Sequence, residues 1–308
     1  MKSRCLKTAT LALLLSASLA STSVNVSAQT TASTDAAAPV FTQQATNVFR
    51  RFAVDLAKMK KFYGDVLGLK PLPTLNMPGG GQMTRFHAGA SEIKLQSSAA
   101  ESQAPRGGVR DVTGLRVLTF FFPDGAALTA RFSEHGYPVP EFHKTSGGVT
   151  GMAVAMVRDP SDQWVELVVV PGAPAETYDR LEIGLTVADV ETSRTFYRGF
   201  VGLEELKPVE DAVLGTTKYP FRLGTTTINV WSFGTGRPAN KSSAGIQYVV
   251  GNVDAIDARG KAKGIKIDRP LSDFTAALRT VWMSDPDGIT NYFAQVARRT
   301  PAPDSQTR

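Results

Sequence analysis

Glu166 is the side chain of this 308-residue sequence whose position most clearly needs a chemical explanation. It lies inside the apolar run 164–170, and burying a carboxylate without a partner is strongly disfavoured. Because side chains alternate along a strand, Trp164 and Glu166 are expected on one face. Glu166 must then face a polar cavity or pair with a cation, and Lys94 or Arg50 is the expected cation. We favour that ion pair over metal binding.

Thiol and imidazole chemistry has little support in the sequence. The single cysteine, Cys5, lies in an N-terminal segment that we expect to be removed. The mature chain then has no thiolate for a metal, a disulfide or nucleophilic catalysis. The three histidines, His87, His135 and His143, are predicted to be surface or capping residues. His135 precedes Gly136 at the end of a predicted helix, where a cation is common.

Residues 1–28 have the three parts of a secretory signal. Basic residues stand at positions 2, 4 and 7, an apolar stretch covers 8–20, and small residues at 26–28 precede a predicted cleavage before Gln29. The apolar stretch is too short to cross a bilayer, and no later stretch approaches the roughly 18 apolar residues of a spanning helix. We therefore expect a secreted or periplasmic protein with no membrane span after removal of the signal.

The charge of the chain does not indicate a nucleic-acid partner. The formal net charge is +6, and removing residues 1–28, which hold three basic and no acidic side chains, leaves 6 − 3 = +3. Lys and Arg are scattered, with no basic block interleaved with aromatic residues. Residues 29–46 are rich in Ala, Thr, Gln and Ser and are predicted to be a flexible tether. Residues 299–308 are predicted to be a disordered tail.

The rest of the chain repeats itself after about 130 residues. In each copy an Asp, Asp55 or Asp189, precedes a Phe-Tyr pair by seven residues, and a Gly-Leu pair follows. This pattern predicts a strand, an Asp N-cap, a helix of about three turns and a glycine C-cap. Each copy continues with two short strands, a further strand, a second helix (124–136 or 253–264) and an Asp-Pro turn before a final apolar strand.

These features together resemble the vicinal-oxygen-chelate superfamily, which includes glyoxalases, bleomycin-resistance proteins and extradiol dioxygenases. The resemblance covers nearly all of residues 47–297 and implies an α+β fold of two tandem domains, 47–172 and 177–298. Each domain would consist of two βαβββ units forming a curled eight-stranded mixed sheet with helices on its convex side. The fold serves isomerases, lyases, dioxygenases, thiol transferases and non-catalytic drug binders, so it does not decide the function.

The resemblance also implies positions for a divalent metal that binds two neighbouring substrate oxygens. These positions are Val48, Val117, Lys94 and Glu166 in the first copy, and Glu182, Gly245, Asn229 and Tyr292 in the second. Neither copy holds two good ligands, so we prefer a site without metal. An exchange of halves between the copies would bring Glu182 and Asn229 together with Glu166. In that alternative the cofactor is a divalent metal (Mg, Mn, Fe or Zn) and its candidate ligands are Glu166 and Glu182.

The concave sheet faces are expected to carry the ligand-binding residues. Our candidates are Arg50, Lys94, Trp164, Glu166, Glu182, Asn229, Trp231, Gln247 and Tyr292. Aromatic walls with a few polar groups are typical of small-molecule pockets, although each aromatic residue alone would equally suit a core. The sequence therefore predicts an exported protein, monomer or homodimer, that binds a small planar or aromatic molecule without metal. The alternatives are a metal-dependent lyase, isomerase or dioxygenase that uses Glu166 and Glu182, and a duplication with a purely structural role; catalytic residues stay unassigned.

Overall fold

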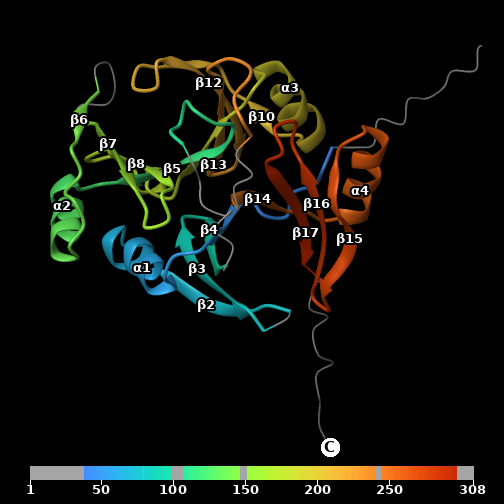
Figure 1. Cartoon of the computed structure of the whole chain (residues 1–308), viewed down its shortest axis with the longest axis horizontal. Helices are drawn as coiled ribbons and strands as arrows, with labels where there is room; N and C mark the ends of the chain where they lie inside the picture. The colour runs from blue at the N-terminus through green and yellow to red at the C-terminus, as the bar shows by residue number, and fades with distance from the viewer. Residues whose placement is uncertain (1–37, 79, 99–106, 146–150, 240–243, 297–308) are drawn as a thin grey trace, which may run out of the picture. The chain divides into compact units, whose positions relative to one another are not determined.

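The computed structural model describes residues 38–78, 80–98, 107–145, 151–239 and 244–296 (Figure 1). Contacts divide the chain into residues 1–35 and 36–308, and all described residues belong to the second part. The predicted signal (1–28), the first part of the predicted tether and the predicted tail lie outside the described residues. No helix in the described ranges has the length and apolarity needed to cross a membrane.

Four units, two in each copy, make up the described fold. The unit 47–97 contains β1 (Asn47–Phe52), α1 (Leu56–Lys60), η1 (Lys61–Val66), β2 (Pro71–Asn76), β3 (Gln82–Ala88) and β4 (Ser91–Ser97). The unit 114–169 contains β5 (Gly114–Phe122), α2 (Gly125–Glu134), β6 (His143–Lys144), β7 (Ala153–Arg158) and β8 (Trp164–Val169). A short helix, η3 (Ala175–Thr177), leads into the second copy.

The second copy repeats this order. The unit 181–231 contains β9 (Leu181–Thr186), α3 (Val190–Arg194), η4 (Thr195–Val201), β10 (Glu204–Glu205), β11 (Val209–Asp211), β12 (Thr216–Leu223) and β13 (Thr226–Trp231). The unit 244–296 contains β14 (Ala244–Val249), α4 (Val253–Ala262), β15 (Ile267–Thr275), β16 (Leu278–Ser284) and β17 (Thr290–Val296). Each unit is thus a strand, a helix and further strands, as the sequence pattern predicts.

The helix ends follow from local side-chain chemistry. Asp55 accepts a hydrogen bond from the backbone N–H of Ala57, and Asp189 accepts one from that of Thr192, so both are N-caps. Each first helix then widens into a π-helical segment, η1 or η4. Gly202 ends the second of these with a φ of 83°, a left-handed conformation that glycine adopts without strain. The predicted caps are confirmed.

The units pair across the two copies. The first sheet has the order β15-β16-β17-β14-β1-β4-β3-β2, so it joins the unit 47–97 to the unit 244–296. The second sheet has the order β10-β12-β13-β9-β5-β8-β7-β6, with β11 beside β12, and joins 114–169 to 181–231. The strand pairs that join two units, here called the seams, are antiparallel: β1 pairs with β14, and β5 pairs with β9. The predicted fold class is confirmed, and its units are combined as in the exchange of halves.

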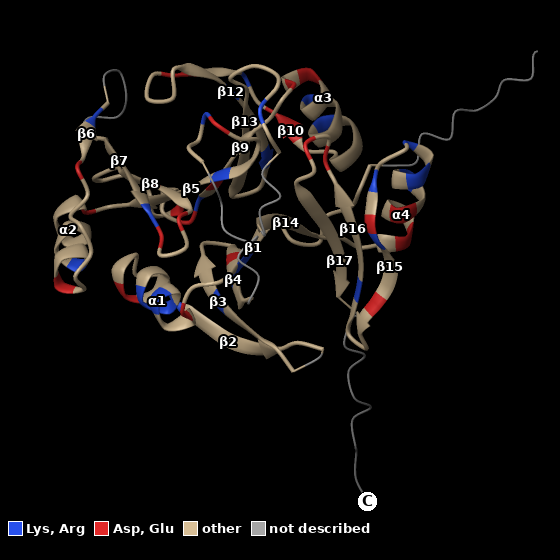
Figure 2. Ribbon diagram, viewed as in Figure 1, with Lys and Arg blue, Asp and Glu red and all other residues tan. Residues whose placement is uncertain are grey.

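Each sheet has one face covered by helices and one concave face (Figure 1). On the helix side of the first sheet, Val48, Phe52 and Ile93 are buried in one hydrophobic core with Phe62 and Tyr63 of the first helix. That core continues through the helix side of the second sheet. Basic and acidic residues are interspersed along α3 and α4 (Figure 2). The concave faces are left to other residues, which form the two candidate sites.

The segment that precedes β1 is held against the first sheet, although residues 29–46 were expected to be a tether. Phe41 forms an isolated bridge with Val250, and the N–H of Thr42 donates to the carbonyl of Val249 at 2.9 Å. Ala45 and Thr46 are fully buried. The described part of this segment is therefore part of the fold.

Candidate functional site

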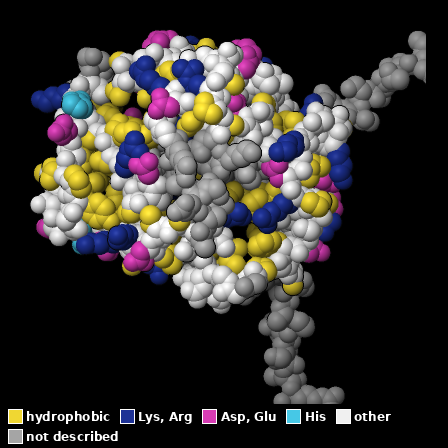
Figure 3. Space-filling model, viewed as in Figure 1, with side chains coloured by type: hydrophobic (Ala, Val, Ile, Leu, Met, Phe, Trp, Pro, Cys, Tyr) yellow, Lys and Arg dark blue, Asp and Glu magenta, His cyan; other side chains and the backbone are white. Residues whose placement is uncertain are grey.

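The concave face of the first sheet holds a cavity of about 600 Å³. Its walls come from β1, β4, β14, β16 and β17, together with residues at the ends of the β2–β3 and β15–β16 hairpins. In Figure 3 the surface is hollowed between β2 and β17, with hydrophobic and basic side chains at the edge. This volume is within the range of small-molecule sites.

Three aromatic rings form a cluster on this face. The rings of Trp282 and Tyr292 are stacked, with centroids 4.7 Å apart and an angle of 16° between their planes. The ring of Phe49 lies 5.2 Å from that of Tyr292 and 5.4 Å from that of Trp282. All three residues line the cavity. Burial raises the pKa of Tyr292, so its hydroxyl group stays protonated.

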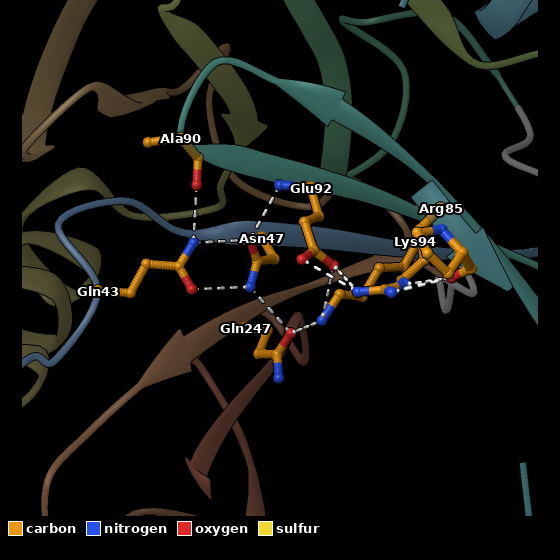
Figure 4. Close-up of polar contacts among 8 residues, drawn as sticks. Gln43, Asn47, Arg85, Ala90, Glu92, Lys94 and Gln247 are labelled. Carbon is orange, nitrogen blue, oxygen red and sulfur yellow. Dashed lines mark hydrogen bonds and ion pairs between the residues drawn. The ribbon is translucent and has the colours of Figure 1, made fainter. Parts of the chain in front are cut away.

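A chain of hydrogen bonds crosses the strands beside this cluster (Figure 4). The side-chain amide of Gln43 donates to the carbonyl of Ala90 at 2.9 Å and to Oδ1 of Asn47 at 3.0 Å. Asn47 also accepts the N–H of Glu92 at 2.9 Å, and its Nδ2 donates to Oε1 of Gln247 at 3.1 Å. Asn47 thereby has only one consistent orientation, because its oxygen accepts a backbone N–H while its nitrogen donates to Gln247.

Lys94 completes the chain. Its Nζ donates to Oε1 of Gln247 at 2.5 Å and lies 3.5 Å from a carboxylate oxygen of Glu92. That carboxylate also pairs with Arg85 at 3.1 Å. Burial lowers the pKa of Lys94, while Glu92 opposes this change. The cavity therefore has a desolvated ammonium group on one wall.

Two guanidinium groups lie over the ring of Trp282. The Cζ atom of Arg269 is 4.6 Å from the ring centroid, and that of Arg51 is 5.8 Å from it. Both arginines line the cavity. Burial, followed by repulsion from Arg269, lowers the pKa of Arg51.

The second sheet brings together the two carboxylates predicted as metal candidates. Thr119 donates to Glu166 at 2.7 Å, and Asn229 donates to Glu182 at 2.7 Å. Thr119 is the register partner of both, on β8 and β9 respectively. Burial raises the pKa of Glu166, Lys218 lowers it, and Glu182 is among the groups that raise it.

Lys218 supplies the positive charge on this second face. It forms an ion pair with Asp211. Burial lowers the pKa of Lys218, but Glu166, Asp211 and Glu182 together raise it above its ordinary value. The cation expected beside Glu166 was Lys94 or Arg50, and that expectation is wrong because both belong to the other sheet.

The second face is almost filled by the protein itself. Its cavity has only about 10 Å³, near the space of one water molecule. The indole of Trp231 lies over Gly184 so closely that a Cβ atom at Gly184 would overlap the ring. The indole N–H of Trp231 donates to Thr186 at 2.8 Å, which holds the ring in place. Trp231 is therefore a core side chain that closes this face.

Arg50 does not face either concave side, in contrast to its predicted place. It shares the helix side of β1 with Val48 and Phe52 and is 1% exposed. Its guanidinium pairs with Asp159, donates to Tyr63 at 2.9 Å and donates to Ser161 at 2.6 Å. The inward residues of β1 are instead Phe49 and Arg51, one position away on each side.

The remaining predicted residues divide between the sheets. Lys94, Gln247 and Tyr292 line the cavity of the first sheet, whereas Glu166, Asn229 and Trp231 line the small one of the second. Glu182, on β9, pairs with Arg180 at 2.6 Å. Trp164 is partly exposed, with Cζ of Arg158 4.1 Å from its ring centroid.

The residue of the first copy that is equivalent to Glu182 is Asn47, one residue before the predicted metal position Val48. Phe49 is opposite Lys94, and Gly184 is opposite Asn229, so Phe49 and Gly184 are equivalent. The equivalent of Glu182 is therefore Asn47, two residues before Phe49. Asn47 stands eight residues before Asp55, whereas Glu182 stands seven residues before Asp189, which is why counting back seven residues from the Asp selected Val48.

The residues of the two faces do not fit the divalent metal of the resembled family. On the first face Gln247, two residues after the expected position Gly245, is the register partner of Asn47 and Tyr292. Lys94 lies beside Gln247, and its ammonium group repels a metal ion. On the second face Lys218 lies among the carboxylates. Among the residues that the structure describes, no three His, Cys, Asp or Glu side chains are grouped so that they could hold a metal.

Sequence reasoning missed Arg51, Arg269, Phe49 and Trp282, which all line the large cavity. Side-chain alternation could have found Phe49 and Arg51 if it had been counted along the strand from Asn47, which lies on the same face, instead of back from Asp55. Trp282 and Arg269 lie on β16 and β15, for which the sequence offered no inward assignment.

Comparisons with known proteins agree with this geometry. The model of the Glyoxalase/Bleomycin resistance protein/Dioxygenase superfamily matches residues 46–167 and 179–293. Glyoxalase I from Zea mays is 19% identical with a TM-score of 0.62, and the match covers 81% of this chain and 91% of that chain. A candidate dioxygenase from Bacillus subtilis subsp. subtilis str. 168 is 16% identical with a TM-score of 0.57, covering 85% and 87%. No curated protein sequence matches.

At these identities the structural likeness shows the fold alone, whereas the two ranges matched by the family model include most of the chain. The chain belongs to the Glyoxalase/Bleomycin resistance protein/Dioxygenase superfamily.

Proposed function

We propose that this protein binds a small planar or aromatic molecule in the cavity of the first sheet, without a metal ion there. The observation that carries the proposal is the cavity of about 600 Å³ with Phe49, Trp282 and Tyr292 on its wall. Aromatic side chains provide large apolar contact area and stack on flat ligands. The polar groups beside them, Lys94 and Gln247, are held by the amide chain and would orient the ligand.

The test uses N-phenyl-1-naphthylamine, an uncharged planar probe whose fluorescence rises in apolar sites. We expect saturable binding of one probe per chain. The matched variant is Phe49→Gly/Gln96→Trp, which gives the first face the Gly184/Trp231 pair that closes the second. This variant should lose probe binding because the indole fills the cavity.

Glu166→Gln is the control, since it changes the other face and should bind the probe normally. Tyr292→Ala provides a second reduction of binding should the double variant fold poorly. Absence of saturable binding, or binding that is lost in Glu166→Gln and kept in both first-sheet variants, would contradict the proposal.

A second candidate is a divalent-metal-dependent lyase, isomerase or dioxygenase on the second face. The observation in its favour is that the pairing of units places Glu166, Glu182 and Asn229 on one sheet. Lys218 and the filled space around Trp231 are against it. Elemental analysis after dialysis separates the two candidates: we expect less than one ion per chain. A stoichiometric ion that is lost in Glu166→Gln would favour the enzyme.

Export remains part of the proposal. It is supported by the basic start, apolar stretch and small residues of positions 1–28, which predict a secreted or periplasmic protein.

A further inference from the structure

Gln247 presents an amide nitrogen without a partner on the wall of the first cavity. The residue lines the cavity and is only 4% exposed. Its hydrogen bonds with the rest of the described chain all use the amide oxygen, so the N–H groups are available to a bound molecule. We propose that this nitrogen donates to a carbonyl oxygen at the edge of the ligand, which is an aromatic or otherwise planar ketone, amide or lactone. This inference rests on the proposed function and adds to it the group by which the ligand is oriented.

The neighbours of Gln247 decide which of its two terminal atoms is the nitrogen. One terminal atom accepts from Nζ of Lys94, and an ammonium group can only donate. The same atom accepts from Nδ2 of Asn47 at 3.1 Å, and Asn47 is itself oriented because its Oδ1 accepts the N–H of Glu92. Both donors require an oxygen at this position. The nitrogen is therefore the other atom, which points away from the network (Figure 4).

Lys94 acts here as a positioning residue. Its ammonium group lies 3.5 Å from a carboxylate oxygen of Glu92, so its charge is met within the protein. Its hydrogen bond to Gln247 opposes a flip of the amide, because a flipped amide would direct N–H groups at the ammonium and at Asn47.

The burial of Gln247 makes its free N–H groups decisive for selectivity. A flat ligand that lies against the aromatic cluster displaces water from this wall of the cavity. A buried N–H that loses water and gains no acceptor opposes binding. An apolar ring alone would leave the amide in that state, whereas a carbonyl oxygen on the edge of the ring would accept from it. The wall therefore favours a ligand with such an oxygen.

The amide also lies where the edge of a ring would come. Gln247 is the register partner of Tyr292, and Tyr292 is the register partner of Trp282 on the strand beyond. The rings of Tyr292 and Trp282 are stacked with centroids 4.7 Å apart. The amide and the two rings thus form one row across β14, β17 and β16, and all three residues line the cavity. A ligand in contact with the rings brings its edge to the amide.

The closed face of the second sheet shows the same position with its donor satisfied. Thr119 pairs in register with Glu166 there, as Gln247 pairs with Tyr292 here. The hydroxyl of Thr119 donates to Glu166 at 2.7 Å, so the protein itself supplies the acceptor. On the first face an aromatic residue stands in the place of that carboxylate. The donor of Gln247 is left to the cavity.

The test compares fluorenone with fluorene, two uncharged flat molecules in which a carbonyl group replaces a methylene group. Their affinities are measured by displacement of N-phenyl-1-naphthylamine, and the ratio of the two affinities is followed. Gln247→Glu puts a carboxylate oxygen in the place of the nitrogen and keeps an acceptor for Lys94 and Asn47. We expect the ratio of fluorenone to fluorene affinity to fall about tenfold in this variant, the effect of one buried hydrogen bond.

Infrared spectroscopy detects the same hydrogen bond without an affinity. The stretching frequency of a carbonyl group falls when its oxygen accepts a hydrogen bond, and an isotopic label separates the carbonyl of fluorenone from those of the protein. We expect a lower frequency for fluorenone bound to the unchanged protein than for fluorenone in an alkane solvent. Gln247→Glu should abolish the difference, and Gln247→Met, which has no donor, gives the same comparison should the first variant fold poorly.

The control is Gln82→Glu, which makes the same chemical change on an exposed glutamine of β3. Gln82 is not among the residues that line the cavity. Its variant should keep both the affinity ratio and the carbonyl frequency of the unchanged protein.

The outcomes distinguish this inference from the proposed function. If N-phenyl-1-naphthylamine does not bind, the proposed function itself fails. If that probe binds but fluorenone does not displace it, the carbonyl ligand is refuted and the cavity is still a binding site. The same conclusion follows if the bound carbonyl has the frequency found in alkane, or if the affinity ratio is equal in the unchanged protein and in Gln247→Glu. A ratio and a frequency that change in Gln247→Glu and not in Gln82→Glu support the inference.

Discussion

Asp159 and Asp285 are equivalent residues whose substitution should have opposite effects. Each opens an Asp-Pro turn and accepts a hydrogen bond from a helix tyrosine at 2.9 Å, Tyr63 in the first case and Tyr197 in the second. Only Asp159 also pairs with a buried arginine, Arg50. We therefore predict that Asp159→Asn destabilises the protein and that Asp285→Asn stabilises it at alkaline pH.

The magnitude for Asp159→Asn follows from the burial of its partner. Arg50 is 1% exposed, and its guanidinium would lose its counter-charge. Removing one partner of a buried ion pair costs about 3–5 kcal/mol. For a protein of this size each kcal/mol corresponds to roughly 2–4 °C in Tm, so the melting temperature should fall by roughly 6–20 °C.

The effect of Asp285→Asn depends on pH. Burial raises the pKa of Asp285 from 3.8 to about 7, so the folded state binds the proton more tightly than the unfolded state. A raised acid pKa makes the contribution of Asp285 to stability largest below pH 4, and this contribution is lost as the pH rises to 7. An uncharged amide avoids that loss, and its oxygen can still accept from the backbone of Ile289. At pH 8 we expect a gain of about 2–4 kcal/mol, and at pH 4 no gain.

Urea unfolding of the unchanged protein and the two variants at pH 4 and pH 8 measures both effects. At pH 8 the free energy of unfolding should be lower in Asp159→Asn than in Asp285→Asn. Equal values in the two variants would show that the ion pair with Arg50 does not cause the difference. An effect of Asp285→Asn that is the same at both pH values would refute the role of its ionisation.

Three further predictions concern closure, charge and export. Gly184→Ala should cost about 1–3 kcal/mol because its Cβ atom would overlap the ring of Trp231. Gly199→Ala, whose Cβ atom would only make an ordinary contact with Thr195 at 3.9 Å, should not, and urea unfolding measures both. Lys218→Met should lower the free energy of unfolding by about 3–5 kcal/mol because it leaves several carboxylates without their cation. Glu166→Gln should lower it by less than about 1 kcal/mol, and equal losses in the two variants would contradict the assigned charges. N-terminal sequencing of protein from a native host should find a start near residue 29, and an uncleaved chain would rule out the signal.

The local features of the fold could be predicted from the sequence because they depend on residues close together in the chain. Asp55 and Asp189 cap helices through backbone groups two or three positions away, and Gly202 ends a helix by its own φ. Strand alternation correctly placed Lys94 on a concave face. It misplaced Arg50 because the span from Asn47 to Asp55 is one residue longer than the equivalent span from Glu182 to Asp189, which reverses the parity counted back from the Asp.

The tertiary structure alone decided which units share a sheet. Gln247 reaches Lys94, and Glu166 lies in the field of Lys218, because β14 pairs with β1 and β9 pairs with β5. Both seams connect units from different copies, and the repeat makes the two possible pairings nearly equivalent in local pattern. The choice depends on contacts between residues more than a hundred positions apart in the first sheet, such as that between Asn47 and Gln247.

The same long-range contacts made one concave face open and the other closed. Trp231 fills the second face because Gly184, on a neighbouring strand, leaves room for its indole. On the first face the equivalent pair is Gln96 and Phe49, and the smaller side chain of Gln96 leaves the cavity open. Sequence reasoning treated all these aromatic residues alike, because whether a ring fills a core or borders a cavity depends on the volume of its neighbours in space.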